Sequence, residues 1–481
     1  MNVRISENRY DELRRFTAPS FMDGVLCPME TGCLLLVSRN FHPVRQDILV
    51  CDILFPEEGD LECAVEGLVF TSGYLRRAMF SARERKLDGF LTVHTHPRTD
   101  SHVGFSEYDD LNDPFLMANL YELMPSGCFG SVVLGRSSAA ARVWNPETTS
   151  YVVPKELIIV GQRLSWLRLD GDSSNDVALS AEIFDRGLAI TGNGALLRLS
   201  RMRVGIVGAS GTGSLVAELL LRAGVREIVI FEFDRIELVN LNRILHSRNS
   251  DAMRRRGKAE RIAEAIAETD IGTSVTVIPE ADICEERVAW ELRGCDFVFG
   301  CVDRDWPRLI LSEFSQQFLV PCVDLGTEIG ITDIVQSLDS RVSYIAPGRP
   351  CLVCSAIVST ERVRLESMND AERARVINMG YSEGSKLAAP AVMDLNMRAA
   401  SYGSLVLRHI LQPFLNEPLP THIKESLTNY NIRPVQFESR SDCPICGGRR
   451  REGVGDSVCL STRDTSNRRH STQRYNHEIC E

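Results

Sequence analysis

Hydrophobic residues in the first 150 positions gather in short runs that are separated by polar and turn-forming stretches. The clearest runs are CLLLVSR, ILVCDILF, GFLTVHTH and GSVVLG. Apolar runs of this length, bounded by turn signals, predict strands. Over residues 74–87 the apolar positions Leu75, Met79 and Phe80 share one side, which predicts a helix. Residues 1–150 are therefore expected to form a first α/β domain.

From residue 201 the pattern changes to a regular alternation of strand and helix. RVGIVG and REIVIFEFD predict strands on either side of a helix over 214–222. A further helix over 258–268 precedes the strand-like runs SVTVI, CDFVFGC and VPCVDLG. This alternation predicts a mainly parallel sheet covered by helices, which is a second, Rossmann-like α/β domain.

Two segments lack such patterns. Residues 151–183 are mixed and polar, including DGDSSNDVALS, and are expected to form a linker between the domains. Residues 448–481 are rich in Arg, Ser, Asn and Thr and poor in apolar residues, so we predict a disordered tail.

Composition excludes several classes of protein. Apolar residues make up 44% and charged residues 25%, as in soluble globular proteins. The formal charge of −11 argues against a nucleic-acid partner, because an acidic chain does not attract phosphate. Apolar runs fall far short of the roughly 20 residues of a membrane helix, and the N-terminus lacks the apolar core of a secretory signal. We expect a cytoplasmic protein with no membrane partner.

The segment VHTHPRTDSHVGFSEYDD carries a candidate metal site. His94 and His96 are two positions apart, so on a strand both imidazoles point to the same face. Asp109 follows after a loop and offers an oxygen ligand. Three such ligands leave a fourth position for water, as in hydrolytic zinc sites. His-X-His pairs alone are common, and His102 is an alternative ligand in the same loop.

The combination of His-X-His-Pro with Ser106 and Asp109 resembles the JAMM/MPN zinc metalloproteases, a deubiquitinase family, over about residues 20–145. The resemblance implies that His94, His96 and Asp109 bind a catalytic Zn²⁺ and that Ser106 helps to hold a tetrahedral oxyanion.

The same family needs a general base ahead of an early apolar strand. METGCLLLV places Glu30 there, and this carboxylate would accept a proton from water and pass it to the leaving amine. The loop from His96 to Ser106 is longer than in the best-known eukaryotic members, which leaves its shape open.

A second candidate site follows the strand RVGIVG. Gly208, Gly211 and Gly213 stand between a strand and a helix, where backbone amides can approach phosphates. Asp234 closes the next strand, where an acidic residue would bind a ribose hydroxyl. Ser210 replaces one glycine of the strict pattern, and these residues alone fit an NAD-dependent dehydrogenase equally well.

The residues beyond that strand favour ATP. Asn240, Arg243 and Lys258 would bring amide and cationic groups to a triphosphate, and Asp303 in CVDRDWPR could hold Mg²⁺. A dehydrogenase has no use for this set.

Together these motifs resemble the ThiF/MoeB/ubiquitin-activating superfamily of ATP-dependent adenylating enzymes, and place the second domain at 184–447. The resemblance assigns the ribose to Asp234, the phosphates to Asn240, Arg243 and Lys258, and Mg²⁺ to Asp303. It also implies that Arg186, in FDRG, enters the ATP site of a partner subunit in a homodimer. Arg308 matches a further family arginine, for which a structural role is equally open.

Two Cys-X-X-Cys pairs predict a structural zinc site. Two such pairs that close a long loop form a tetrathiolate with no open position. The ligands would be Cys351, Cys354, Cys443 and Cys446. Residues 355–442 contain no cysteine that could take an activated carboxyl as a thioester, which leaves Cys459, Cys480 or direct transfer to another protein.

The two resemblances imply a bifunctional enzyme of a bacterial-type ubiquitin-like pathway. The first domain would cleave a ubiquitin-like protein, and the second would adenylate its C-terminal carboxylate with Mg-ATP. A conjugating enzyme is a further expected partner. One alternative is processing and activation of a sulfur-carrier protein for thiolation. Another, of a different class, is a scaffold that binds without catalysis.

Overall fold

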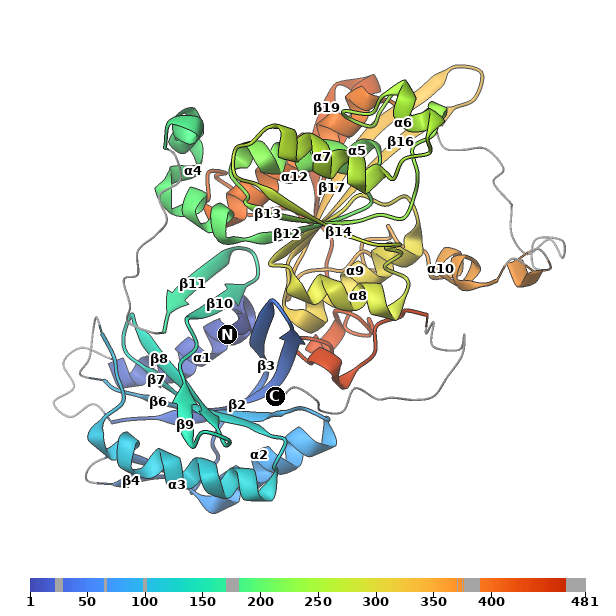
Figure 1. The fold of residues 1–481 in the computed structure, drawn as a ribbon. Coiled ribbons are helices and arrows are strands. Elements are labelled where there is room, and N and C mark those ends of the chain that lie inside the picture. Colours follow the sequence, from blue (N-terminus) through green and yellow to red (C-terminus); the bar gives the residue numbers. More distant parts are fainter. Residues whose placement is uncertain are drawn as a thin grey trace.

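The computed structural model shows two lobes, each built on its own sheet (Figure 1). The residues that the structure describes are 1–21, 29–64, 67–97, 102–169, 181–369, 371–373, 375 and 390–463.

The first lobe contains a nine-stranded mixed sheet in the order β11-β10-β1-β3-β2-β6-β7-β8-β9. Its strands are β1 (Asn2–Ser6), β2 (Gly32–His42), β3 (Arg45–Leu54), β6 (Gly89–Thr95), β7 (Cys128–Leu134), β8 (Ala139–Asn145), β9 (Ser150–Val152), β10 (Glu156–Val160) and β11 (Leu164–Arg168). A separate ribbon pairs β4 (Leu61–Ala64) with β5 (Gly67–Phe70).

Helices cover both faces of this sheet. Helix α1 (Glu7–Thr17) packs on one face, whereas α2 (Ser72–Glu84) and α3 (Glu107–Leu123) pack on the other. Successive residues of β2 therefore enter two different cores, and the strand is buried along most of its length. This double burial explains the uninterrupted apolar run CLLLV, which lacks the alternation of a half-exposed strand.

The second lobe contains an eight-stranded sheet in the order β14-β13-β12-β15-β16-β17-β18-β19. Its strands are β12 (Arg203–Val207), β13 (Glu227–Phe231), β14 (Ser274–Ile278), β15 (Phe297–Gly300), β16 (Cys322–Ile331), β17 (Val335–Ile345), β18 (His422–Ser426) and β19 (Asn431–Val435). The pairs from β14 to β16 are parallel, and those from β16 to β19 are antiparallel.

Helices again lie on both faces of the second sheet (Figure 1). Those labelled above it in that view are α5 (Gly211–Ala223), α6 (Asn249–Met253), α7 (Lys258–Glu268) and α12 (Met393–Leu411), with α4 (Ala181–Arg201) at one side. Those below are α8 (Glu286–Glu291) and α9 (Asp305–Phe318), with α10 (Thr360–Ser367) at the other side. The mixed α/β architecture predicted from the alternation of strands and helices is confirmed.

The structure differs from the predicted linker over 151–183. Strands β10 and β11 fall inside this range, and β10 pairs in parallel with β1 at the edge of the first sheet. The run ELIIV is a strand because it pairs with β1, which is far away in the sequence, and with β11, which follows directly after it. Residues 170–180 lie outside the described residues.

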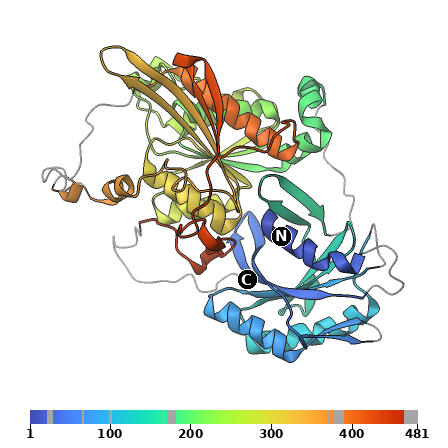
Figure 2. The same ribbon diagram turned by 180° about the vertical axis from the view of Figure 1, so that it is seen from behind.

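The structure also corrects the predicted tail over 448–481. Residues 448–463, here called the C-terminal strap, lie at the junction of the two lobes (Figures 1 and 2). Residues 464–481, with Cys480, lie outside the described residues.

Buried polar contacts hold the strap in place. Glu452 is 1% exposed and accepts a hydrogen bond from Arg9 Nε at 3.1 Å, and Val454 joins the core between the first sheet and α2. Further on, Arg463 Nη2 lies 2.8 Å from Asp282 Oδ2 in the second lobe. The strap is ordered mainly by buried hydrogen bonds and ion pairs, which a low apolar content does not reveal.

Candidate functional site

The first lobe brings two histidines and a carboxylate together at one end of β6. His94 is near the end of this strand, His96 follows it, and Asp109 lies in the first turn of α3. His94 Nε2 lies 3.2 Å from His96 Nε2 and 3.3 Å from Asp109 Oδ1. His96 Nε2 lies 3.5 Å from Asp109 Oδ2. The three residues predicted as zinc ligands therefore converge on one point.

The geometry of this cluster fits a tetrahedral zinc ion. Zn–N bonds of about 2.0–2.1 Å place two nitrogen ligands about 3.3 Å apart, close to the separation of the two imidazoles. The two nitrogens and the carboxylate oxygen all lie within 4.8 Å of one another. Three ligands leave one position of the tetrahedron for water or substrate.

Ser106 fixes the carboxylate of this cluster. It is the N-cap residue of α3, and its N and Oγ both donate to Asp109 Oδ2, at 2.7 and 2.8 Å. In return Ser106 Oγ accepts a hydrogen bond from Asp109 N, which completes a capping box. Burial raises the pKa of Asp109, but hydrogen bonds from His94 and His96 outweigh it and hold this pKa well below its usual range.

Glu30 lies two residues before β2, next to Thr31, whose O accepts a hydrogen bond from Thr95 N, so the chain places it beside the end of β6 that carries His94. Burial raises the pKa of Glu30, and the charges of His96 and His94 act in the opposite direction. Burial lowers the pKa of His96, but the hydrogen bond to Asp109 and the charge of Glu30 raise it overall. The exposed His102 is outside the cluster of possible metal ligands among the described residues.

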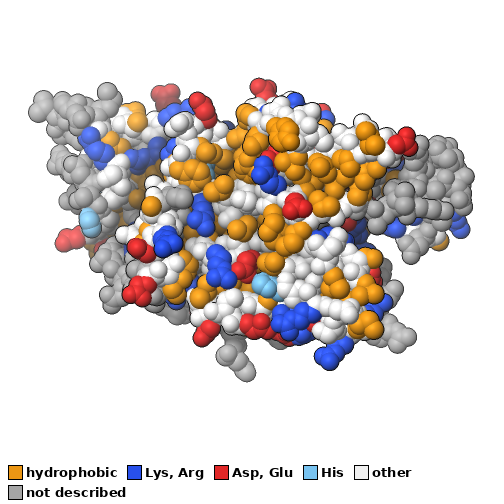
Figure 3. All heavy atoms as spheres, turned by 90° about the horizontal axis from the view of Figure 1, so that it is seen from above, with side chains coloured by type: hydrophobic (Ala, Val, Ile, Leu, Met, Phe, Trp, Pro, Cys, Tyr) orange, Lys and Arg blue, Asp and Glu red, His pale blue; other side chains and the backbone are white. Residues whose placement is uncertain are grey.

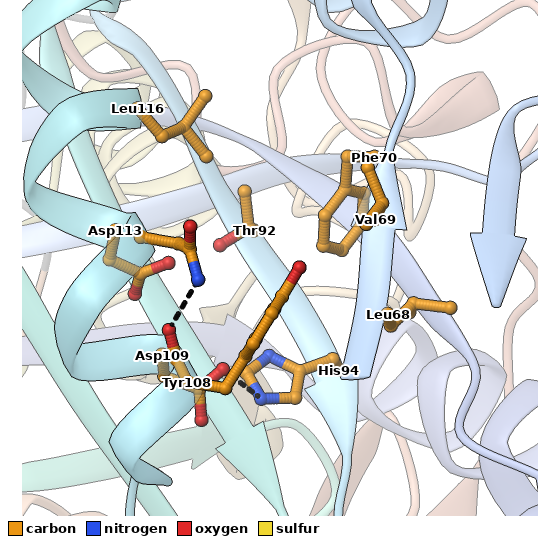
Figure 4. A pocket seen from close by; sticks show the side chains of 10 residues that line it. Leu68, Val69, Phe70, Thr92, His94, Tyr108, Asp109, Asp113 and Leu116 are labelled. Carbon is orange, nitrogen blue, oxygen red and sulfur yellow. Dashed lines mark hydrogen bonds and ion pairs between the residues drawn. The ribbon is translucent and has the colours of Figure 1, made fainter. Parts of the chain in front are cut away.

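A pocket of about 200 Å³ opens beside His94 (Figure 4). Strand β5 forms one wall through Leu68 and Phe70, and α3 forms the other through Tyr108 and Leu116. The metal cluster therefore borders a small pocket whose wall also includes the polar residues Thr92, Asn112 and Asp113.

The second lobe contains a larger cavity, of about 800 Å³, at the carboxyl ends of its parallel strands. Open α/β sheets bind their ligands at this edge. The predicted nucleotide residues in its wall are Gly208, Gly211, Asp234, Asn240, Arg243, Lys258 and Asp303. Motifs spread over 95 positions of the sequence thus meet around one space.

The three predicted glycines have different tasks. Gly208 has φ +89°, and a Cβ there would lie 2.6 Å from Cys301 O, so conformation and space both require glycine. Gly213 is outside the cavity wall, and its Cβ would meet Gly208 O at 1.9 Å, which shows that it packs the loop against the helix. Gly211 borders the cavity at the start of α5.

Cationic and acidic side chains lie next to one another in the wall of this cavity. Lys258 Nζ lies 2.8 Å from Asp234 Oδ2, so the predicted phosphate ligand contacts the predicted ribose ligand. Asn240 is buried, and its Oδ1 accepts a hydrogen bond from Glu237 N at 3.0 Å. This bond orients the amide, while Arg243 lines the wall beside it.

Asp303 lies in the loop after β15 and is exposed to the cavity. Arg308 holds this loop, because its Nη2 donates to Val302 O at 2.8 Å while its Nε donates to Asp324 Oδ1 at 3.1 Å. The structural role left open for Arg308 is therefore visible in its contacts.

Arg186 stands apart from the cavity. It is exposed on α4 and is absent from the cavity wall formed by the described residues. Its proposed place in the site of a second subunit stays a prediction.

Several wall residues escaped the sequence reasoning. Glu232 accepts hydrogen bonds from Ala209 N, Phe233 N and Asp234 N, each at 2.9 Å, and so ties the glycine loop to the end of β13. Its place two residues before the acidic Asp234 was the available signal. The other unpredicted polar wall residues include Arg235, Arg255, Arg304, Thr327 and Asn396.

The four predicted cysteine ligands form a compact cluster. Cys351 Sγ lies 3.6 Å from Cys443 Sγ, and Cys354 Sγ lies 3.5 Å from Cys446 Sγ. Zn–S bonds of about 2.3 Å separate tetrahedral sulfur ligands by about 3.8 Å, so the cluster fits a closed zinc site. Cys459, considered as a thioester carrier, is exposed on the strap.

The model of the ThiF family matches residues 184–445, which is 262 of the 481 residues. The chain belongs to the ThiF family. The ThiF match contains the residues that line the nucleotide cavity and three of the four cysteines, and it ends one residue before Cys446. It begins at residue 184, so the JAMM/MPN resemblance of the first lobe stays a prediction.

The chain is also similar to curated proteins over part of its length. Ubiquitin-like modifier-activating enzyme 5 of Caenorhabditis elegans is 26% identical over 195 residues, covering 37% of this chain and 44% of that protein. The Rattus norvegicus protein of the same name is 24% identical over 196 residues, covering 38% and 46%. The chain spans about half the length of the curated relatives it matches.

Among solved structures, E. coli MccB is 20% identical, with 58% of this chain and 75% of that chain covered and a TM-score of 0.44. SeMet PaaA is 17% identical, with 56% and 88% covered and a TM-score of 0.40. Likeness at this level adds nothing to the ThiF assignment. In the described part of the chain, every helix is too short or too polar to cross a bilayer.

Proposed function

We propose that the ThiF domain uses Mg-ATP to adenylate the C-terminal carboxylate of a ubiquitin-like or peptide partner. A carboxylate oxygen forms a bond to the α-phosphorus while the bond to pyrophosphate breaks, which yields an acyl adenylate and pyrophosphate. The observation that carries the proposal is the single cavity in which the glycine loop, the cations and Asp303 meet. Membership of the ThiF family and the similarity to enzymes named for activating ubiquitin-like modifiers support it.

The wall residues divide the nucleotide between them. The start of α5 at Gly211 presents backbone N–H groups to the phosphates. Arg243 and Lys258 would neutralise phosphate charge, and Asp303 would hold Mg²⁺. Asp234 would exchange its ion pair with Lys258 for a ribose hydroxyl, which frees the lysine for the triphosphate.

ATP–pyrophosphate exchange tests this function. We would use the Glu30→Gln chain, so that a partner is not cleaved, with a panel of ubiquitin-like proteins that end in a free glycine. The proposal expects exchange that depends on one partner and disappears with Asp303→Ala. Measurable ATP binding without exchange for any partner would contradict it and favour a binding scaffold.

The first lobe favours a second activity, a zinc peptidase that acts on the same partner. His94, His96 and Asp109 have the separations of zinc ligands, and Glu30 lies beside them. A bound zinc ion would supply Lewis acidity toward the scissile carbonyl and the attacking water. Glu30 would accept the proton from that water and deliver it to the leaving amine. The pocket beside His94 would receive the extended C-terminal segment.

Paired variants separate the two activities. Glu30→Gln is expected to abolish cleavage of a ubiquitin-like fusion and to leave exchange intact, and Asp303→Ala is expected to do the reverse. If either substitution removed both activities from a folded chain, the two-site proposal would be wrong. Fusion of the two domains would raise the effective concentration of a newly exposed carboxylate near the second site.

The chemical form of the product on the partner protein distinguishes the two candidate pathways. A C-terminal thiocarboxylate on the partner would indicate sulfur-carrier activation, whereas conjugates would indicate a ubiquitin-like pathway with a conjugating enzyme.

One face of the ThiF lobe could receive this partner or a second subunit. Hydrophobic side chains are spread over the face seen from above (Figure 3). Exposed apolar residues on elements of this lobe include Met253, Ile334, Met397, Leu405 and Ile432. Exposed apolar surface of this kind marks contact with other proteins.

A further inference from the structure

The nucleotide cavity contains one buried amide to which the proposed function gives no task. Asn396 lies in α12, is 4% exposed and forms part of the cavity wall. Its Oδ1 accepts a hydrogen bond from Thr327 Oγ1 at 3.3 Å. Within the described part of the chain, its Nδ2 donates no hydrogen bond. Because Asn396 borders the cavity, its N–H groups at Nδ2 are available to a ligand bound there.

The position of Gly211 shows where this amide points. A Cβ at residue 211 would lie 2.3 Å from Asn396 Nδ2 and 3.3 Å from Arg243 Cδ. Nδ2 therefore lies against the first residue of α5, in space that only a glycine leaves open. Ser210, the N-cap residue of α5, makes no side-chain capping bond, so the first N–H groups of the helix are also available.

These donors converge on the place where a phosphate would sit. We propose that Asn396 Nδ2 donates a hydrogen bond to a non-bridging oxygen of the α-phosphate and is a catalytic residue of adenylation. The proposal rests on the adenylation proposed above. As the carboxylate oxygen bonds to phosphorus and pyrophosphate leaves, negative charge gathers on these oxygens, and a donor oriented in advance stabilises it.

Thr327 is a positioning residue in this arrangement. Its hydroxyl donates a hydrogen bond to Asn396 Oδ1, and this bond orients the amide so that Nδ2 faces α5. A glycine at position 211 therefore has two effects. It exposes the backbone N–H groups of α5, and it leaves room for the side-chain amide of Asn396.

Substitutions at 396 test the proposal in the full chain. We would compare Asn396→Ala and Asn396→Asp with Met397→Ala, which alters the next residue, whose side chain is 48% exposed. Pyrophosphate exchange with the ubiquitin-like panel, ATP affinity by titration calorimetry and melting temperature would each be measured. Loss of a donor to a developing oxyanion lowers kcat by about 10²-fold or more.

We expect Asn396→Ala to lose about that factor in exchange while its ATP affinity and melting temperature stay near those of the parent chain. Asn396→Asp should lose more, since it replaces the donor with a negative charge. Met397→Ala should match the parent. Exchange at the parental rate in Asn396→Ala, or a fall matched by equal losses of ATP affinity and stability, would overturn the proposal.

A double-mutant cycle checks the role of Gly211. Gly211→Ala should cost much less exchange in the Asn396→Ala chain than in the parent, because the methyl group then meets no amide. Equal costs in both chains would contradict the link between the two residues. Absence of exchange in the parent chain would instead contradict adenylation itself, so the two failures are distinguishable.

Discussion

Arg4 Nη2, in the first lobe, lies 3.2 Å from Asp296 Oδ1, in the second. The Arg4 side chain is 1% exposed, and its Nη1 also donates to Leu319 O at 3.0 Å. Arg45 Nη1 lies 2.5 Å from the same Asp296 oxygen. The junction between the lobes therefore contains buried charges that Asp296 pairs across the two lobes, while Asp47 of the first lobe also contacts both arginines.

Removal of that carboxylate should destabilise the whole chain. Asp296→Ala removes the carboxylate that Arg4 and Arg45 contact across the junction, but both keep Asp47, so we expect a loss below the roughly 3–5 kcal/mol of a fully broken buried pair. Arg222→Ala is the control, since it removes an exposed pair with Glu218 worth less than about 1 kcal/mol. Urea unfolding of both variants measures the difference. Similar midpoints for the two would refute a stabilising role for Asp296.

The C-terminal strap should be part of the first lobe's stability. A chain that ends at residue 447 loses the burial of Val454, worth about 1.5–3 kcal/mol, and leaves Arg9 without Glu452. A chain that ends at residue 463 keeps both. We expect only the shorter chain to melt earlier by calorimetry and to lose hydrogen-exchange protection in β2 and β3. Equal protection in both chains would show that the strap is dispensable.

Elemental analysis should find two zinc ions per chain. His94→Ala should lower this to one, whereas His102→Ala should leave two. A chelator should remove the ion of the three-ligand site first, because the tetrathiolate has no open position for attack. Loss of both ions at the same rate, or a single ion in the parent chain, would contradict the assignment of a separate metal site to the first lobe.

His422 should make stability depend on pH. Burial, with Arg341 and Arg349, lowers its pKa to about 4, and Asp324 opposes them only in part. The unfolded chain, with a histidine pKa near 6.5, then binds a proton that the folded chain does not. Stability is therefore complete above about pH 6.5 and falls as pH drops toward 4, by about 3 kcal/mol at most.

The control for this effect is His422→Phe, which keeps a ring against Phe437. Urea unfolding at pH 7 and pH 5 would compare the two chains. The substitution should flatten the loss of stability between these values. An unchanged slope would show that other groups cause it.

Gly208→Ala should impair nucleotide binding through the Asp303 loop. A residue with φ near +89° costs about 1–2 kcal/mol when it carries a Cβ, and that atom would also displace Cys301 O. We expect weaker binding of Mg-ATP by calorimetry, with most of the loss depending on Mg²⁺. Gly272→Ala, at φ +87° with nothing within 4 Å of its Cβ and outside the cavity wall, is the control for backbone strain alone.

The sequence predicted correctly those helices and strands whose residues carry a clear local pattern of apolar and polar positions. The helix over 258–268 and the strand over 274–278 have the predicted bounds, because an amphipathic repeat and a β-branched run each carry their own signal. Strand β10 pairs with β1, about 150 residues earlier, and with β11, which follows it directly. The distant pairing with β1 joins it to the first sheet, and no local pattern announces that contact.

The candidate sites show the same division. The glycines, Asp234 and Asp303 follow strands of one parallel sheet, so their convergence follows from topology. Asn396 reaches the cavity only because α12 packs on α5, and no short motif announces that contact. Ser106 was placed at the metal site from its motif, but its capping of α3 depends on where the helix begins.

The strap also constrains the order in which the protein can fold during synthesis. Ser38 in β2 donates to Gly453 O, a partner 415 positions later. At about 5–20 residues per second, a ribosome needs roughly 20 to 80 s to make that partner. During this interval the surface of β2 and β3 that the strap covers stays exposed in the first lobe, where chaperones could bind. The domain that is translated first thus stays incomplete until most of the second has been made.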